Sequence, residues 1–429
     1  MTSPARWAPA ALVCALVLSA CAGGFSPPTP FGATVEQPTS TAIPIATPSD
    51  QAAPAATQTG ASEVTPEATG PAIDRFQPGT AVEIQSIQMI DATGGWALGR
   101  AGGSDDHVLK TGDGGLTWRD VTPPRPAALP PARGTDSAFF FLDNRTGWVV
   151  DLVDRGEALP IEMDLWNTSD GGQTWVPGGR VDPTDYPEAA PILQFTDVTT
   201  GWLLLQHFIG MGHHGLTLLR TIDAGAGWER LAGMPESETT CVRTGLSFAD
   251  AANGWMTDEC PFEPGSVLLE VSEDGGTTWE ALTLPPPAQA PDLFQTALSC
   301  STRSPHLFGP EAGKLVVTCS MEGEGGTQER SFLYTTADGG ASWQTSVFPG
   351  GELYLLDPGH GWALSTDLHW TEDGGTSWTK IKTVAWEGQF SFVSPQLGWA
   401  VARSEQEAAL VQTADGGRTW ELLEPIISP

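Results

Sequence analysis

The sequence predicts an all-β fold, a single seven-bladed β-propeller of four-stranded antiparallel blades. Three observations support this prediction. The pattern [ST]-x-D-G-G-x-[TS]-W occurs six times, and a weaker seventh copy stands at Thr221–Trp228. A Gly-Trp pair lies upstream of most copies, and short runs rich in β-branched and aromatic residues flank these pairs. Repetition at a spacing of about fifty residues matches one propeller blade per copy.

The eight-residue pattern has the composition of a tight turn between two strands. Its Asp can accept backbone N–H bonds inside the turn, and its paired glycines permit positive φ. Its Trp offers a large apolar face for packing between neighbouring sheets. The seven Asp and Trp positions are Asp113 and Trp118, Asp170 and Trp175, Asp223 and Trp228, Asp274 and Trp279, Asp338 and Trp343, Asp373 and Trp378, and Asp415 and Trp420.

This pattern resembles the Asp box, or BNR repeat, of sialidase-like β-propellers. The resemblance implies one Asp box per blade, in the turn between the third and fourth strands. In its single ring and its Gly-Trp repeats the chain also resembles the Ycf48- or Hcf136-like photosystem II assembly factors. That resemblance implies a lipoprotein that binds a nascent membrane protein through a basic patch. The acidic balance of this chain departs from that pattern.

The N-terminus reads as an export signal followed by a tether. The apolar run Ala8–Ala20 is too short to span a bilayer and suits a signal peptide, residues 1–21. Leu18–Cys21 looks like a bacterial lipobox, which makes Cys21 the expected site of lipid attachment. Residues 22–80 are rich in Pro, Thr and Ala and are expected to form a disordered tether.

Residues 81–429 are expected to form the propeller. The third unit reads as strand, turn, strand, loop, strand, motif turn and strand, a four-stranded meander. The last repeat has its own fourth strand at Trp420–Ile427, so no strand exchange between the termini is required. The fifth unit lacks the Gly-Trp pair, and Lys314 occupies the position of the missing Trp.

The cysteines that remain after the lipobox form two pairs with the same nineteen-residue spacing. Each pair would lie across the first hairpin of two consecutive blades. We therefore expect the disulfides Cys241–Cys260 and Cys300–Cys319, in keeping with an oxidising compartment. Four free buried thiols are the alternative.

The charge balance narrows the class of partner. The chain has 20 Lys and Arg against 52 Asp and Glu, a net charge of −32. Because phosphate binding needs a basic face, a nucleic-acid partner is not expected. The sequence has no motif for a cofactor or a metal, so none is expected, and the propeller is expected to be a monomer.

Variable segments are expected on one face of the propeller. The second turn of each meander and the links between blades share this face, whereas the motif turns lie on the other. Loops on a rigid scaffold often carry binding residues. The candidate binding residues are the loop acids Asp105, Asp106, Asp154, Asp164, Asp258 and Glu259. The simpler interpretation, which we favour, is that they are solvated charges that keep the protein soluble.

The resemblance to sialidases implies an arginine triad and a Tyr nucleophile. The chain has three Tyr, at 186, 334 and 354, and none has a matching setting, so no catalytic residue is assigned. We expect an exported scaffold, lipid-anchored at the outer face of a bacterial cell membrane, that binds a protein or glycan and acts as an assembly or accessory factor. A glycoside hydrolase on the same scaffold is the alternative.

Overall fold

The computed structural model describes residues 75–102, 106–124, 138–153, 162–179, 181, 191–210, 213–231, 241–260, 265, 267, 269–323, 326–404 and 408–428. The chain divides into two compact units, Met1–Thr65 and Pro66–Pro429, and every described residue belongs to the second. The expected signal peptide, Cys21 and most of the expected tether therefore lie outside the described residues. Among the described residues, no helix has the length and apolar character needed to cross a bilayer.

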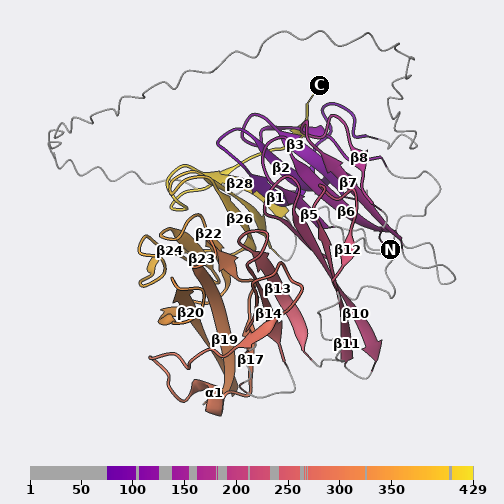
Figure 1. Ribbon diagram of the computed structural model, residues 1–429. Helices are drawn as coiled ribbons and strands as arrows, with labels where there is room; N and C mark the ends of the chain where they lie inside the picture. Colours follow the sequence, from indigo (N-terminus) through magenta and orange to yellow (C-terminus); the bar gives the residue numbers. More distant parts are fainter. Residues whose placement is uncertain are drawn as a thin grey trace, which may run out of the picture. The chain divides into compact units, whose positions relative to one another are not determined.

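The described part is nearly all β, with one short helix, α1 (Leu293–Thr296) (Figure 1). The first sheet holds β1 (Glu83–Met89), β2 (Gly95–Arg100), β3 (His107–Thr111), β4 (Thr117–Asp120) and β30 (Ile426–Ile427). The second sheet holds β5 (Ala138–Phe141), β6 (Gly147–Val153), β7 (Glu162–Thr168) and β8 (Val176–Pro177). The third sheet holds β9 (Ile192–Phe195), β10 (Gly201–Gly210), β11 (His213–Thr221) and β12 (Glu229–Arg230).

A nine-stranded sheet follows along the chain. It holds β13 (Val242–Phe248), β14 (Gly254–Glu259), β15 (Leu269–Ser272), β16 (Glu280–Leu282), β17 (Ser299–Thr302), β18 (His306–Leu307), β19 (Gly313–Gly323), β20 (Gly326–Thr336) and β21 (Gln344–Phe348). A single residue pair, Glu259 with Ser301, joins its two halves, and within each half the strands form an antiparallel meander.

The last two sheets have four strands each. They hold β22 (Glu352–Leu355), β23 (Gly361–Leu364), β24 (Asp367–Thr371) and β25 (Thr379–Thr383), then β26 (Glu387–Phe392), β27 (Gly398–Arg403), β28 (Ala408–Thr413) and β29 (Glu421–Leu422). Consecutive four-stranded antiparallel sheets of this kind are consistent with a β-propeller.

Trp side chains of the Gly-Trp pairs pack each meander against the next one along the chain. Trp148 and Trp202 are almost completely buried. The Trp148 ring stacks on Phe195 at 3.6 Å between centroids, and the Trp202 ring stacks on Phe248 at 3.7 Å. Because the Phe ends the first strand of the following meander, the same apolar contact recurs between neighbours.

The same Trp residues also donate hydrogen bonds across these contacts. Four of these indoles, those of Trp148, Trp202, Trp362 and Trp399, donate to the carbonyl at the first Gly position of the motif turn in the neighbouring meander, as in Trp202 to Gly275 at 2.9 Å and Trp362 to Gly416 at 3.1 Å. Lys314, at the position of the missing Trp, donates from Nζ to the equivalent carbonyl of Gly374. The prediction that Lys314 occupies the position of the missing Trp is therefore confirmed by its hydrogen bond.

The Asp side chains of the motif accept hydrogen bonds inside their turns, as the sequence predicted. In the copy at Thr371–Trp378, the Asp373 carboxylate accepts bonds from the Ser377 amide at 2.9 Å, the Ser377 hydroxyl at 2.6 Å and the Thr371 hydroxyl at 2.8 Å. Both glycines of this turn have positive φ. In the weaker copy Ala224 holds φ 63° at the first glycine position, a conformation that is costly for a residue with a Cβ.

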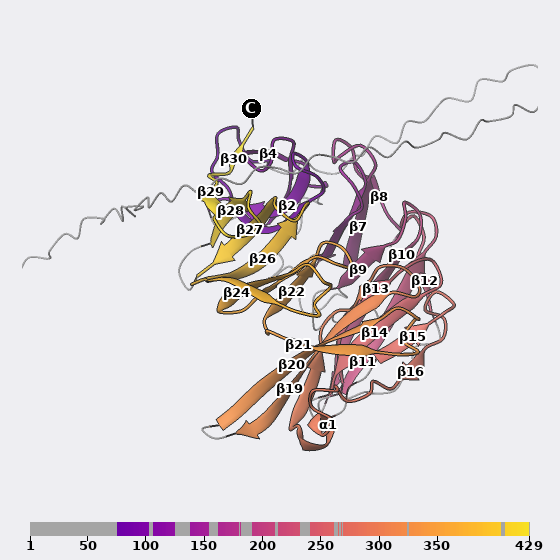
Figure 2. The ribbon, with the colours of Figure 1, turned by 90° about the vertical axis from the view of Figure 1, so that its left-hand side faces the viewer.

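The ends of the described chain meet at the outer edge of the first sheet. Strand β30 pairs in parallel with β4, and Figure 2 shows the two side by side. The backbone of Ile427 accepts from Gly79 at 2.9 Å and donates to Thr80 at 2.9 Å. The expectation that residues 420–427 form one fourth strand is therefore wrong, because the chain leaves its own sheet after Leu422 and joins the first.

Residues 75–80, expected in the tether, also contact the first sheet. The Phe76 amide donates to Asp120 Oδ2 at 3.0 Å, and Arg75 donates to the Thr122 carbonyl at 3.1 Å. The Phe76 ring stacks on His107 at 4.0 Å. The sequence boundary at Ala81 came from composition, whereas the fold begins to make contacts six residues earlier.

Candidate functional site

Two adjoining cavities open among the second turns and inter-sheet links of the later meanders, the part of the fold where variable segments were expected. The first encloses about 860 Å³ and the second about 600 Å³. Glu352, at the start of β22, lines both cavities, so they meet at this residue. We call the two cavities together the groove.

The first cavity lies between the last two sheets. Its walls are the start of β22, the turn after β23, the link that leads into β26 and the end of β27. An aromatic side chain, Trp386, lies in that link and is partly buried; its edge-on contacts with Phe390 and Trp420 fix its ring. The groove residues on this side are Gly351, Glu352, Leu364, Ser365, Thr366, Val384, Ala385, Trp386, Glu387, Gly388, Arg403 and Ser404.

The second cavity lies around the junction of the nine-stranded sheet. The hairpin of β19 and β20 forms one wall, and Figure 2 shows this hairpin as a long projection. Hydroxyl and carboxylate groups predominate in its lining, which consists of Thr244, Glu259, Ser301, Thr302, Arg303, Ser304, His306, Val316, Thr318, Glu329, Glu352 and Leu353. Such a surface offers many donors and acceptors to a polar ligand.

One ion pair stands where the two cavities meet. Arg303 and Glu352 approach to 2.5 Å between Nη1 and Oε1, and their side chains are 43% and 66% exposed. At this exposure the pair adds little stability. The Glu352 carboxylate nevertheless offsets the positive charge that Arg303 would otherwise present to a ligand.

The remaining basic groups of the lining are Arg403, which keeps its charge, and His306. Arg403 donates from Nη2 to the carbonyl of Gln85. Burial lowers the pKa of His306, which keeps its imidazole neutral at pH 7. Among the residues that line the groove, the acids Glu259, Glu329 and Glu387 have no ion pair within the described part of the chain.

Two disulfides hold the walls of the second cavity. Cys241 bonds Cys260, and Cys300 bonds Cys319, as the sequence predicted. Cys260 follows Glu259 directly, while Cys319 follows Thr318 in β19. The covalent bonds therefore fix the strands that present these side chains, which reduces the conformational cost of ordering them around a ligand.

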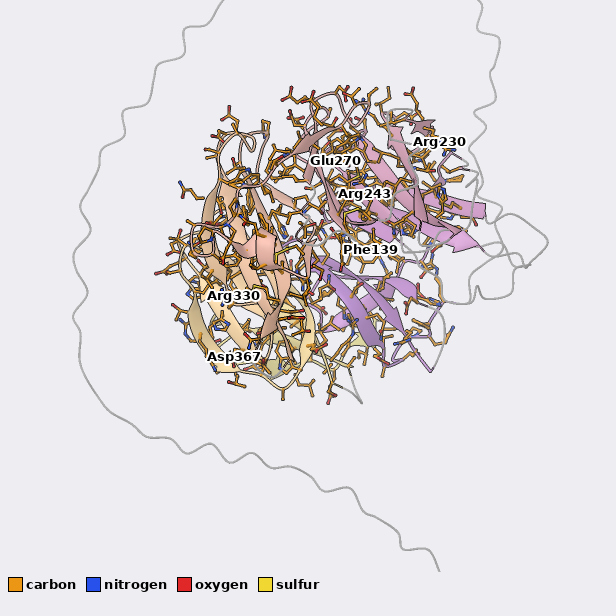
Figure 3. All side chains as sticks on the ribbon, turned by 90° about the horizontal axis from the view of Figure 1, so that it is seen from below. Phe139, Arg230, Arg243, Glu270, Arg330 and Asp367 are labelled. Carbon is orange, nitrogen blue, oxygen red and sulfur yellow. A yellow bond between two sulfur atoms is a disulfide. The ribbon has the colours of Figure 1, made fainter. Side chains whose placement is uncertain are left out.

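A buried charge cluster lies beside the groove in the β13–β15 meander. Arg243 pairs with Asp258. It also pairs with Glu270 at 2.8 Å, and Figure 3 labels Arg243 and Glu270. Asp258 is 1% exposed, and burial raises its pKa to about 6 although Arg243 opposes this shift. The expectation that Asp258 is an exposed loop acid is therefore wrong: it lies within β14 with its carboxylate facing Arg243.

The other acids predicted for the binding face are dispersed. Glu259 lines the second cavity. Asp106 and Asp164 are partly buried and do not line the groove. Asp105 and Asp154 lie outside the described residues.

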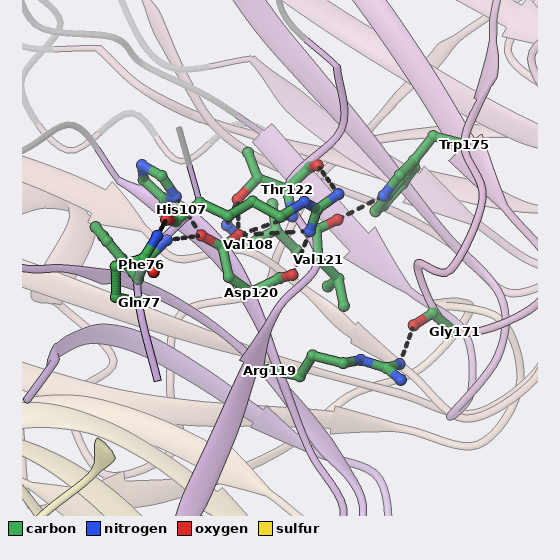
Figure 4. A network of polar contacts seen from close by, with 11 residues as sticks. Phe76, Gln77, His107, Val108, Arg119, Asp120, Val121, Thr122, Gly171 and Trp175 are labelled. Atoms are coloured by element: carbon green, nitrogen blue, oxygen red, sulfur yellow. Dashed lines mark hydrogen bonds and ion pairs between the residues drawn. The ribbon is translucent and has the colours of Figure 1, made fainter. Parts of the chain in front are cut away.

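A second polar cluster fastens residues 75–76 to the first sheet (Figure 4). His107 Nδ1 lies 2.7 Å from Asp120 Oδ2, and the Thr122 hydroxyl donates to Asp120 Oδ1 at 2.6 Å. Burial opposes ionisation of Asp120, but the hydrogen bonds from His107 and Thr122 outweigh it and lower its pKa to about 2. Because the hydroxyl donates to the carboxylate and not to the His, this cluster has the form of a structural anchor.

Sequence reasoning missed most groove residues. Arg303, Glu352 and Trp386 belong to segments that differ from unit to unit, so no repeat marks them. One signal was present for Trp386: it is among the few Trp residues outside the Gly-Trp and motif positions. Within the described residues, no group of three or more His, Cys, Asp or Glu side chains is placed to hold a metal ion.

Comparisons with known proteins bear on the fold. No family model matches the chain, and the curated proteins give no match. Among solved structures, the polysaccharide lyase Uly1 is similar with a TM-score of 0.50 and 12% identity, over 80% of this chain and 91% of that one. A PL25 ulvan lyase has a TM-score of 0.46 at 12% identity, with 82% and 96% covered.

An α-L-arabinofuranosidase of Fusarium graminearum is a further similar structure, with a TM-score of 0.42, 12% identity, and 65% and 90% of the two chains covered. At these identities a likeness concerns the fold alone, and of these three structures Uly1 has the TM-score that supports a shared fold. Together with the consecutive antiparallel sheets, it is consistent with a β-propeller.

Proposed function

We propose that this protein is an exported, lipid-anchored propeller that binds a glycan chain in the groove. The observation that supports this most is the groove itself, where a fixed Trp ring adjoins a cavity lined by hydroxyls and carboxylates. Sugar rings present apolar faces that stack on aromatic side chains, and their hydroxyls exchange hydrogen bonds with groups of the second kind.

We propose seven blades, with one Asp box in each. The halves of the nine-stranded sheet meet through one residue pair only, Glu259 with Ser301, so each half suits one blade. The bond from Lys314 to Gly374 takes the place of an indole bond between two neighbouring blades. The Asp373 turn lies between β24 and β25, the third and fourth strands of its sheet, and its hydrogen bonds are those that the Asp of the motif predicts.

The two disulfides indicate an extracellular environment. Attachment at Cys21 to the outer face of a bacterial membrane is a proposal from the lipobox alone. It would place the groove where it meets glycans outside the cytoplasm.

Binding to a panel of neutral oligosaccharides, measured by isothermal titration calorimetry, tests the glycan-binding proposal. We expect Trp386→Ala to weaken binding by about fivefold and Trp386→Phe to retain most of it, since one stacking contact is worth about 1 kcal/mol. Thermal unfolding of both variants checks that the fold survives. Binding unchanged in Trp386→Ala would refute the groove as the site.

Glycoside hydrolysis is a second candidate, favoured by three carboxylates, Glu259, Glu329 and Glu352, that line one cavity. Paired carboxylates supply the acid and the nucleophile or base of glycosidases. Turnover of a glycan panel that is lost in Glu329→Gln, while oligosaccharide binding persists, would establish this activity. Crosslinked capture of a stoichiometric membrane protein, with no glycan bound, would favour the protein-binding alternative.

A further inference from the structure

We infer that the groove selects glycans without carboxylate or sulfate groups, and that Glu352 enforces this selectivity by occupying Arg303. The inference deepens the proposed glycan binding and rests on it. It concerns a specificity-determining residue and the chemical class of the ligand.

Arg303 is the basic residue best placed to bind an anionic sugar. It lines the second cavity next to the point where the two cavities meet, and its side chain is 43% exposed. A guanidinium binds carboxylate or sulfate oxygens through paired hydrogen bonds. In this structure Glu352 takes that position, at 2.5 Å from Arg303 Nη1.

The other charged basic group of the described lining, Arg403, already has a carboxylate beside it. Arg403 stands opposite Glu387 in the register of β26 and β27, both line the first cavity, and one guanidinium N–H donates to the carbonyl of Gln85. His306 is neutral at pH 7 because burial disfavours its charged form. An anionic sugar would therefore have to displace Glu352 from Arg303 and bind beside that second carboxylate, whose charge repels it.

The surrounding charge acts in the same direction. Glu259 and Glu329 line the second cavity, and Glu387 lines the first. The chain as a whole carries a net charge of −32. Like charges within a Debye length, about 8 Å at physiological salt, repel an anionic ligand both on approach and when bound.

A neutral chain meets none of these obstacles. Its rings can stack on Trp386 in the first cavity, and its hydroxyls can bond the Ser301 and Thr318 side of the second. Because the cavities meet at Glu352, a chain of several sugars can pass over the ion pair. Its hydroxyls can donate to Glu352 and accept from Arg303 without separating them.

The experiment compares a neutral hexasaccharide series with oligogalacturonate of equal length, by calorimetry at low and physiological salt. We expect wild-type protein to bind a neutral chain and to bind oligogalacturonate at least tenfold more weakly. Glu352→Gln releases Arg303, so this variant should gain tenfold or more in affinity for oligogalacturonate. Adding Arg303→Ala to that variant should abolish the gain.

Glu421→Gln is the matched control. Glu421 is exposed on β29 and does not line the groove, so its substitution removes the same charge and leaves Arg303 paired. Equal gains in Glu352→Gln and Glu421→Gln would refute the role of the ion pair. Wild-type binding of oligogalacturonate as tight as that of a neutral chain would overturn the inference and leave glycan binding intact. Binding of no glycan by any of these proteins would overturn both.

Discussion

Lys314 shows how one residue can replace another of different chemistry at a repeat position. The Gly-Trp indoles donate a neutral N–H to a turn carbonyl of the next meander, and Lys314 donates from its ammonium instead. Its side chain is 4% exposed, and burial lowers its pKa. The hydrogen bond to Gly374 compensates part of the cost of burying that group.

We predict that Lys314→Ala lowers the free energy of unfolding by about 1–3 kcal/mol, because the Gly374 carbonyl loses its buried donor. Urea unfolding followed by Trp fluorescence measures this. Lys382→Ala is the control, since Lys382 makes one exposed contact at 3.3 Å and should change stability by no more than about 0.5 kcal/mol. Equal effects of the two substitutions would contradict the role given to Lys314.

Asp258 should make stability depend on pH in an unusual direction. Its folded pKa is raised to about 6, against 3.8 for an ordinary Asp. Between these values the folded chain holds a proton that the unfolded chain has released. The stabilising contribution is thus full below about pH 4 and is lost as the pH rises through about 6.

We predict that wild type gains stability relative to Asp258→Asn as the pH falls from 7.5 to 4.5, by about 2 kcal/mol. Arg243 and Glu270 face the same carboxylate and remain in both proteins. Urea unfolding at four pH values measures the difference. Parallel stability profiles for the two proteins would show that Asp258 does not titrate in this range.

At the scale of elements, the motif turns form a graded series. Asp373 accepts from a backbone amide and from two hydroxyls, whereas Asp223, in the weaker copy, accepts from the Gly227 amide and the Thr221 hydroxyl. A Gly at position 227 supplies no hydroxyl for the second carboxylate oxygen. The hydrogen bonds of Ser377 and Thr371 lower the pKa of Asp373 to about 2.

We predict that Asp373→Ala costs about 1 kcal/mol of stability and that Asp223→Ala costs less, since one hydrogen bond fewer is lost. Chemical unfolding at pH 7 compares them. Repeating the measurement at pH 2 should narrow the difference, because about half of the Asp373 carboxyl groups are then protonated and lose the charge that strengthens these bonds. A larger loss for Asp223→Ala would contradict this account.

Elements were predictable from the sequence where they repeat. The Asp and Gly residues of the motif impose the same local turn wherever they occur, and equal offsets of the Cys residues predicted both disulfide pairs. Strand β30 was not predictable, because Ile426 and Ile427 are too few to show a period and their partner is more than 300 residues away. Arg303, Glu352 and Trp386 come together only through the fold, so no local sequence pattern could predict the groove.

At the scale of the whole molecule, contacts between the last meander and the first join the two ends of the series of sheets. The Trp399 indole donates to the Gly114 carbonyl at 2.8 Å, and the Ile87 and Met89 amides donate to Gln389 and Ser391. Ile427 adds its side chain to the core that these sheets share. Side-chain packing and backbone pairing thus both join the last meander to the first.

We predict that Ile427→Ala lowers the free energy of unfolding by about 2 kcal/mol or more, because it opens a cavity in that core. Ile426→Ala is the matched control: Ile427 is 4% exposed and Ile426 40%, so the control should cost markedly less. Calorimetric melting measures both. Similar melting temperatures for the two variants would show that β30 contributes through its backbone alone.

The place of β30 also sets an order of events during synthesis. Domains generally begin to fold from the end that is translated first, but here the outer edge of the first sheet needs residues 425–428, which are translated more than 300 residues after β4. The early strands must therefore wait for these residues before their edge is covered. A nascent chain that has not reached Ile427 exposes that edge, which makes it a substrate for chaperones and proteases.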